Sequence, residues 1–371
     1  MRQGVAHLTS VHPRYDTRIF VKECSSLSGE GYDVTLIVAD GRGDEVKNGI
    51  DIVDVGKAGG RVSRMVSIVY RIYRYAVETD AEICHLHDPE LLWIAPLLKR
   101  HGKRVVYDSH EDLPKLVMAK YYIPSSVRRV LARFAEIVEG IFVSSVDAVV
   151  SPTPSITKRF ERMGKRVSQV ANYPSLAEIS GDFPWEKRGR SVCYIGAIAR
   201  SRGIEEMVEA IGGTDIVLEL GGDFRPASLR DEISGLPGWA NVKEHGYIGR
   251  DEVVEILGRS KIGLVVLHPL ESYRESIPVK MFEYFAAGMP VIASDFPFWR
   301  DMLDGCECIR FVDPSDVDGL KKAIEEILDD DEKARIMGEN GAEIVKERFN
   351  WDIEFSNLIE CYEKISERAD A

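Results

Sequence analysis

The chain has 371 residues, enough for two domains of ordinary size, and 44% hydrophobic with 29% charged residues is typical of a globular protein. The formal net charge of −13 argues against general binding of nucleic acid. No apolar run approaches the ~18 residues of a membrane-spanning helix, and six scattered cysteines make no disulfide framework. The first seven residues do not have the apolar stretch of a signal peptide, so the expected location is the cytoplasm.

Charge is distributed unevenly along the chain. Residues 1–190 carry a net charge of +4, and residues 191–371 carry −17. The two halves are therefore expected to meet different partners.

Short β-branched runs alternate with helical patterns from one end of the chain to the other. In the first half the predicted strands are 5–9, 34–38, 83–87, 104–109 and 148–151, with helices at 18–27, 90–100 and 126–141. In the second half they are 192–196, 216–221, 242–246, 262–267, 291–294 and 308–312. Strands separated by helices of ten or more residues indicate βαβ units and a parallel sheet.

The fold class expected is α/β, with two doubly wound, Rossmann-like domains that face each other across a cleft. The domains are predicted at 1–175 and 191–350, joined by a Pro- and Gly-containing linker at 176–190. A long helical pattern at 351–371 closes the chain, and composition does not decide on which domain it packs.

The most informative stretch runs from Glu275 to Pro290, between two predicted strands. Pro278 suits a first helical turn, and the Gly288–Pro290 segment ends the helix. Core positions follow the i, i+3, i+4, i+7 pattern, which leaves Lys280, Glu283 and Ala287 on the opposite face. Free amides at this helix start favour a diphosphate, and Glu283 could accept hydrogen bonds from a ribose.

The same stretch resembles a family signature. Two glutamates at 275 and 283, separated by seven residues and followed by Tyr-Phe-Ala-Ala-Gly-Met-Pro, resemble the motif of retaining glycosyltransferases of family 4, which have the GT-B fold. Segments 9–20, 87–91 and 107–114 are similar to blocks of a subgroup for surface polysaccharides, and 246–249 and 349–351 also fit. The resemblance covers nearly the whole chain, in order.

The resemblance implies an acceptor-binding first domain, a nucleotide-sugar-binding second domain and a final helix at 351–371 that crosses back to the first domain. Glu283 would hold the ribose hydroxyls. Glu275, with the backbone of Ser276 and Ile277, would meet the sugar or diphosphate, and Tyr247 lies in a segment expected near the base. His110, at a predicted strand end, matches the family's first-domain histidine that touches the donor sugar.

The expected phosphate contacts depart from the family pattern. Family members place an Arg directly after a strand-ending Gly and a Lys six positions after that Gly. Here Gly196 is followed by Ala197, and position 202 is Arg202, with Arg200 nearby. A cation is still needed because a departing diphosphate accumulates negative charge, and we expect Arg202 to supply it, with Arg200 second. Without the resemblance, Arg200 is interpreted equally well as a solvent-exposed charge on a loop.

The family's Gly-Gly pair after the first strand is also replaced here, by Arg14 and Tyr15. This loop would then have to use side chains in place of the glycine backbone. The acceptor-side candidates are Asp16, Arg18, His87 and Glu90. Arg18 could instead only pair with a carboxylate.

A metal site is possible at His85 and His87, which share one face of a strand and precede Asp88. Two histidines and a carboxylate can bind zinc, but no motif supplies a third fixed ligand. The family needs no protein-held metal, so we expect no cofactor beyond the donor and no metal site.

Arginines 61, 64, 71 and 74, together with arginines 128, 129 and 133, add to the positive balance of the first half. Basic amphipathic helices can lie on anionic membranes, although a solvated helix face explains the same pattern equally well. A peripheral contact with the inner face of the membrane is therefore one expectation.

The function predicted is retaining transfer of a hexose from a nucleoside diphosphate sugar to a glycan or polyprenyl-linked acceptor. One alternative is a nucleotide-sugar isomerase or hydrolase of the 2-epimerase kind on the same fold. Another is a catalytically silent nucleotide-sugar-binding subunit, which Ala197 and the missing Gly pair would favour. A dinucleotide-dependent oxidoreductase is disfavoured because no Gly-x-Gly-x-x-Gly follows the first strand.

Overall fold

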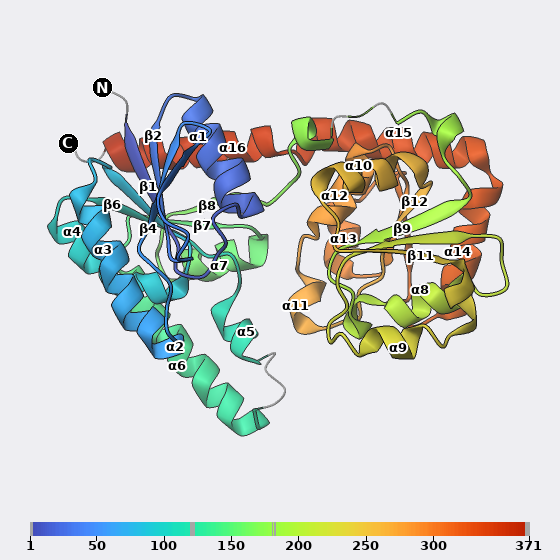
Figure 1. The fold of residues 1–371 in the computed structure, drawn as a ribbon, viewed down its shortest axis with the longest axis horizontal. Helices are drawn as coiled ribbons and strands as arrows, with labels where there is room; N and C mark the ends of the chain where they lie inside the picture. The colour runs from blue at the N-terminus through green and yellow to red at the C-terminus, as the bar shows by residue number, and fades with distance from the viewer. Residues whose placement is uncertain (1–2, 119–122, 180, 182, 368–371) are drawn as a thin grey trace. The chain divides into compact units, whose positions relative to one another are not determined.

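The structure is a computed structural model that describes residues 3–118, 123–179, 181 and 183–367. The chain divides into two compact units (Figure 1). The first unit comprises Met1–Asn172 with Asp352–Ala371, and the second comprises Tyr173–Trp351. Each unit is described by itself.

The first unit is built on an eight-stranded sheet in the order β3-β4-β2-β1-β5-β6-β7-β8. All neighbouring pairs are parallel except β3 with β4. The strands are β1 Gly4–Leu8, β2 Asp33–Val38, β3 Glu45–Lys47, β4 Ile50–Asp54, β5 Ile83–Leu86, β6 Arg104–Asp108, β7 Ala148–Ser151 and β8 Val167–Gln169.

Helices cover both faces of this sheet (Figure 1). They are η1 Thr17–Cys24, α1 Ser25–Gly29, α2 Arg61–Ser63, η2 Arg64–Ile68, α3 Val69–Glu78, η3 Pro89–Ile94, α4 Ala95–Arg100, α5 Leu113–Met118, α6 Ser125–Val143, α7 Pro154–Arg162 and α16 Trp351–Ser366. A buried apolar cluster joins one face of the sheet to α3, α4 and α7. The other face meets η1 and α16, and it carries the alternate, polar side chains of β1 and β5.

The second unit contains a six-stranded, entirely parallel sheet in the order β11-β10-β9-β12-β13-β14. Its strands are β9 Ser191–Ile195, β10 Val217–Gly221, β11 Val242–Gly246, β12 Ile262–Val265, β13 Val291–Ser294 and β14 Ile309–Val312. Its helices are η4 Leu176–Ile179, η5 Trp185–Lys187, η6 Arg200–Arg202, α8 Ile204–Ala210, α9 Leu229–Ile233, η7 Pro237–Asn241, α10 Arg250–Arg259, α11 Glu271–Arg274, α12 Val279–Ala286, α13 Pro297–Met302, α14 Val317–Asp329 and α15 Asp331–Arg348.

The predicted strands are all present in these two sheets, to within two or three residues at their ends. Three further strands, β3, β4 and β8, escaped the sequence analysis. Strands β3 and β4 form a hairpin around Asn48-Gly49, both with positive φ, which is the dipeptide that a two-residue hairpin turn favours. Strands β3 and β8 have only three residues each, too few to show a period of two.

Arg188, in the segment 176–190 that is expected as a linker, packs within the second unit. The guanidinium of Arg188 donates hydrogen bonds to the carbonyls of Leu257 (3.0 Å), Ser260 (2.5 Å) and Ala287. Burial lowers the pKa of this guanidinium to about 10. The end of the segment at Arg188 is therefore part of the second unit rather than a free connection.

Candidate functional site

The start of helix α12 is fixed by the loop that precedes it in the second unit. Trp299 is fully buried, and its indole Nε1 donates a hydrogen bond of 2.7 Å to the carbonyl of Ser276. The Ser276 hydroxyl donates to the carbonyl of Tyr273 at 2.9 Å. Both contacts hold the backbone before Val279, so the amides of the first helical turn have a defined direction.

Two cations approach the glycine that ends strand β9. Gly196 has a φ of +131°, and a Cβ built there would lie 2.8 Å from Lys280 Nζ and 3.9 Å from Arg202 Nη1. Lys280 Nζ lies 3.7 Å from the centroid of the Tyr194 ring, as in a cation–π contact. A side chain at position 196 would displace the lysine, which accounts for the glycine.

The Lys280 amino group is buried and has no hydrogen-bond partner among the described residues. Its burial lowers its pKa well below the usual lysine value, and the nearby charge of Arg202 lowers this pKa further. The described part of the chain also offers no carboxylate within ion-pair distance of Arg202. An anion bound here would relieve both charges.

Glu283 lies one turn beyond Lys280 on α12, and its carboxylate is already paired. Arg250 Nη1 donates to Glu283 Oε1 at 2.7 Å, and Arg250 Nη2 lies 3.5 Å from Glu178 Oε2. The Glu283 side chain keeps 17% of its surface exposed, so its carboxylate is open to a ligand as well.

The remaining predicted donor-site residues are more dispersed. Glu275 follows α11 and has the conformation of a helix C-cap, and Ile277 is half-buried. Tyr247 follows β11 and is 83% exposed. Arg200 forms ion pairs with Glu205 and Glu232, so its charge is already neutralised, unlike that of Arg202.

In the first unit, His110 lies just beyond the carboxyl end of β6. Its Nε2 is 3.1 Å from Asp108 Oδ2 and 3.1 Å from His87 Nδ1. Asp108 is fully buried, and Arg18 donates to both of its oxygens at 2.8 and 3.1 Å. Burial raises the pKa of the Asp108 carboxyl, but Arg18, His110 and His87 together outweigh this and hold the pKa well below its usual range. His110, with 18% of its side chain exposed, is oriented by a buried carboxylate.

The acceptor-side candidates have structural contacts of their own. Asp16 accepts hydrogen bonds from the amides of Arg18 and Ile19 at 2.9 and 3.0 Å, so it caps η1. Glu90 accepts from the Ser10 hydroxyl at 3.2 Å and lies 2.8 Å from Arg64 Nε. The interpretation of Arg18 as the partner of a carboxylate is the one that its contacts favour.

The predicted residues are thus only partly brought together. Gly196 and Arg202 meet, while Arg200 points to other partners; His87 and His110 meet within the first unit. Sequence analysis missed Lys280 as a site residue. The available signal was its position three residues before Glu283 on the helix face opposite the core.

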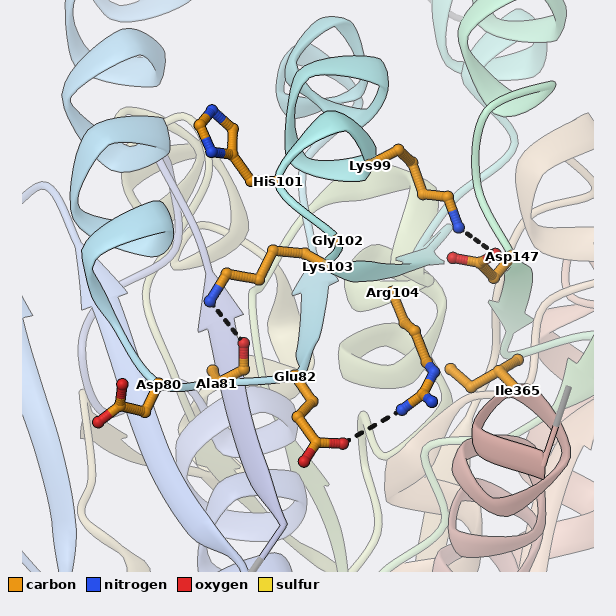
Figure 2. Close-up of a pocket in the computed structure, with 10 residues that line it drawn as sticks. All are labelled: Asp80, Ala81, Glu82, Lys99, His101, Gly102, Lys103, Arg104, Asp147 and Ile365. Carbon is orange, nitrogen blue, oxygen red and sulfur yellow. Dashed lines mark hydrogen bonds and ion pairs between the residues drawn. The ribbon is translucent and has the colours of Figure 1, made fainter. Parts of the chain in front are cut away.

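A pocket lies at the opposite edge of the first sheet, at the amino ends of β5 and β6 (Figure 2). Four of its charged side chains are paired with one another: Lys99 with Asp147 at 2.6 Å, and Arg104 with Glu82 at 3.2 Å. Lys103 Nζ donates to the carbonyls of Thr79 and Ala81 at 2.6 and 2.8 Å. Because ligands of parallel α/β sheets bind at the carboxyl ends of the strands, we assign no function to this pocket.

Two family models match the chain and together cover most of it. The model described as "Glycosyl transferases group 1" matches residues 177–344, and "Glycosyltransferase Family 4" matches residues 18–172. A phosphatidyl-myo-inositol mannosyltransferase of Mycobacterium leprae is 22% identical over 332 residues, which are 85% of this chain and 84% of the relative.

Solved structures agree in fold over nearly the whole chain. A sucrose-phosphate synthase from Thermosynechococcus elongatus has a TM-score of 0.79 at 19% identity, covering 99% of this chain and 100% of that one. The Anabaena protein HepE, solved in complex with UDP and glucose, has a TM-score of 0.75 at 12% identity, covering 98% and 100%. At these identities the likeness establishes the fold.

His12, beside His110, provides a test of the electrostatics of the first unit. Burial lowers the pKa of His12, but the carboxylates of Asp16, 3.5 Å away, and of Asp88, 3.4 Å away, outweigh it and raise this pKa. A raised folded-state pKa stabilises the fold below the ordinary histidine pKa, and this stabilisation is lost as pH rises through the folded-state value. We expect His12→Asn to lower the thermal midpoint more at pH 5.5 than at pH 8.5.

The measurement is thermal unfolding of both proteins across this pH range, with His101→Asn, on the surface beside Tyr73, as the control. An equal loss at both pH values would contradict the assignment of these carboxylates as partners of a protonated His12.

Proposed function

The chain belongs to the family 4 glycosyltransferases, with the GT-B fold, and from this premise we propose that it transfers a sugar from a nucleoside diphosphate sugar with retention of anomeric configuration. The acceptor we propose is a glycan or a lipid-linked sugar. The solved complex of HepE with UDP and glucose supports the donor class, and the name of the mycobacterial relative, a phosphatidylinositol mannosyltransferase, supports a lipid-linked acceptor.

The observation that carries this proposal is the pair of cations beside Gly196. A nucleoside diphosphate carries several negative charges, and more charge develops on its terminal phosphate as the sugar departs. Arg202 and Lys280 supply two positive charges beside the first turn of α12, whose amides add a partial positive charge. This proposal assigns the neutralisation of the diphosphate to side chains and requires no metal in the transfer step.

Glu283 is our choice for the ribose hydroxyls. Arg250 donates to Oε1 of Glu283, so the second carboxylate oxygen, Oε2, can accept hydrogen bonds from a ligand. Arg250 thereby fixes the carboxylate without covering it. Glu275 and the backbone of Ser276 and Ile277 are proposed to meet the sugar or the diphosphate, with Tyr247 near the base and Arg200 only as an outer charge.

The transfer step we propose needs no enzymic nucleophile. The sugar–phosphate bond breaks, the acceptor hydroxyl bonds to the anomeric carbon on the same face, and the departing phosphate oxygen takes the acceptor proton. His110, oriented by Asp108, is proposed to contact the donor sugar. His87 and Glu90 are proposed to border the acceptor.

An apolar surface on helix α6 is the support for a membrane contact. Within the described ranges, six of its large apolar side chains are exposed: Val127, Val130, Leu131, Phe134, Ile137 and Ile141. Arg129 and Arg133 lie on the same helix, and Figure 1 shows α6 extending beyond the sheet of the first unit. Among the described residues no helix is long and apolar enough to cross a bilayer. We propose that α6 lies on an anionic membrane surface, where a lipid-linked acceptor would be found.

Donor binding is tested by thermal unfolding with UDP, GDP and ADP. A nucleotide at 100 times its Kd adds about 2.7 kcal/mol, which raises the midpoint by a few degrees. We expect one of the three to do so in wild type and not in Glu283→Ala. The exposed Glu343→Ala, on α15, is the control and should respond as wild type does. An undiminished shift in Glu283→Ala would overturn the ribose assignment, and no shift with any nucleotide would overturn the donor site.

The two cations are tested by calorimetry with the nucleotide that stabilises the protein. Charged hydrogen bonds contribute about 1.5–3 kcal/mol, so Arg202→Met and Lys280→Met should each lower the affinity for the diphosphate about 10- to 100-fold. Their affinity for the corresponding nucleoside should change little. Arg200→Met, whose charge is paired with Glu205 and Glu232, is the matched control and should bind within about twofold of wild type. Equal losses in all three variants would contradict the assignment.

Membrane contact is tested by flotation with phosphatidylglycerol vesicles at low salt, against phosphatidylcholine vesicles. We expect binding to the anionic vesicles that Phe134→Ser and Ile137→Ser weaken, with little change in the thermal midpoint because both side chains are more than half exposed. Val46→Ser, an exposed apolar change on β3, is the control. If the wild-type protein remains in the unbound fraction, the proposed contact of α6 with the membrane is wrong.

A further inference from the structure

Three histidines and a glutamate form a buried cluster on the sheet face covered by η1 and α16. His7 of β1 and His85 of β5 are register partners in neighbouring strands, and His87 follows β5 on the same face. Glu23 reaches them from η1. We call these four residues the histidine cluster; each is at most 2% exposed.

The ligand atoms of the histidine cluster converge. His7 Nδ1 lies 2.9 Å from His87 Nε2 and 3.6 Å from Glu23 Oε2, and His87 Nε2 lies 3.8 Å from the same oxygen. With one atom taken from each residue, all four lie within 4.8 Å of one another. A tetrahedral ion with nitrogen and oxygen ligands at ~2.1 Å separates them by ~3.4 Å, and the three distances of 2.9, 3.6 and 3.8 Å lie within about 0.5 Å of this spacing.

Two of these atoms have no hydrogen-bond partner in the described part of the chain: His85 Nε2 and Glu23 Oε2, both of which are buried. A buried polar group without a partner destabilises a fold. A bound cation would satisfy both atoms.

The outer atoms of His85, His87 and Glu23 are already held, as in metal sites, whereas His7 Nε2 is buried without a hydrogen-bond partner among the described residues. His87 Nδ1 is 3.5 Å from Asp108 Oδ2, and His85 Nδ1 is 2.6 Å from the Tyr362 hydroxyl of α16. Arg18 Nε lies 3.1 Å from Glu23 Oε1, which leaves Oε2 for the cluster. Such outer contacts fix the tautomer and orientation of ligating imidazoles.

Arg18 lies between the buried carboxyl groups of Asp108 and Glu23, at 2.8 and 3.1 Å. Buried histidines favour the neutral imidazole, which is the form that binds metal.

We propose that His7, His85, His87 and Glu23 bind one divalent transition-metal ion of the zinc class, in a closed structural site that ties β1, β5 and η1 together. Four protein ligands of nitrogen and oxygen type, without an open position, are typical of a structural rather than a catalytic ion. The site lies beneath the strand ends that carry His110, so the ion would hold the platform on which that histidine is oriented. This ion would have a structural role and would take no part in the transfer reaction.

The first test uses wild-type protein freed of metal with a chelator and titrated with Co²⁺. We expect intense visible d–d absorption that saturates at one equivalent, its loss when Zn²⁺ is added, and a higher thermal midpoint with Zn²⁺. Absence of this absorption, or saturation without any change in the midpoint, would overturn the proposal, and neither readout depends on transfer activity.

Variants then locate the ion. Glu23→Gln and His85→Gln should abolish or red-shift the Co²⁺ absorption, whereas His101→Gln, outside the cluster, should leave it unchanged. A second group, formed by His87, Asp108 and His110, shares one ligand with the cluster. Loss of the absorption in His110→Gln with its retention in His85→Gln would place the ion there and contradict the proposal. If a cluster variant does not fold, the wild-type titration still decides.

Discussion

Two positively charged side chains converge on one glycine, and the proposed donor site depends on this arrangement. Arg202 and Lys280 come from segments far apart in the sequence, and both approach the position that a Cβ of Gly196 would take. Burial of the Lys280 amino group and the nearby charge of Arg202 both lower the pKa of this lysine. Such an arrangement is typical of a site for a polyanionic ligand, and in the proposed donor site it would take the place of the absent arginine at position 197.

The first unit resolves its electrostatics in the opposite way. Its buried face carries carboxyl groups and neutral imidazoles, and Arg18 lies between Asp108 and Glu23. The same parallel architecture produces both results, because it collects the polar residues of successive strands at one edge or on one face. Orientation of His110 by Asp108 and the convergence of the histidine cluster are therefore two consequences of one strand register.

Much of the fold could be predicted from the sequence, because buried parallel strands are continuous apolar runs separated by helices. The exceptions, such as β3 and β8, are too short to carry a pattern. For the site, Gly196 and Glu283 could be proposed from local motifs. For Lys280 the sequence could indicate only that it shares the helix face of Glu283, because its contact with Gly196, 84 positions away, depends on the fold. Arg200 could not be separated from Arg202 without their partners. Likewise, His7 and Glu23 join His85 only through strand pairing and the packing of η1.

The account depends most directly on the Lys280 amino group, whose pKa can be measured by NMR titration of the lysine side-chain carbons, assigned with Lys280→Met. We predict a pKa well below the ordinary value of about 10.4 in the free protein, and a return toward that value when the nucleoside diphosphate binds. An ordinary pKa that the nucleotide leaves unchanged would contradict the claim that this site is built to hold a diphosphate.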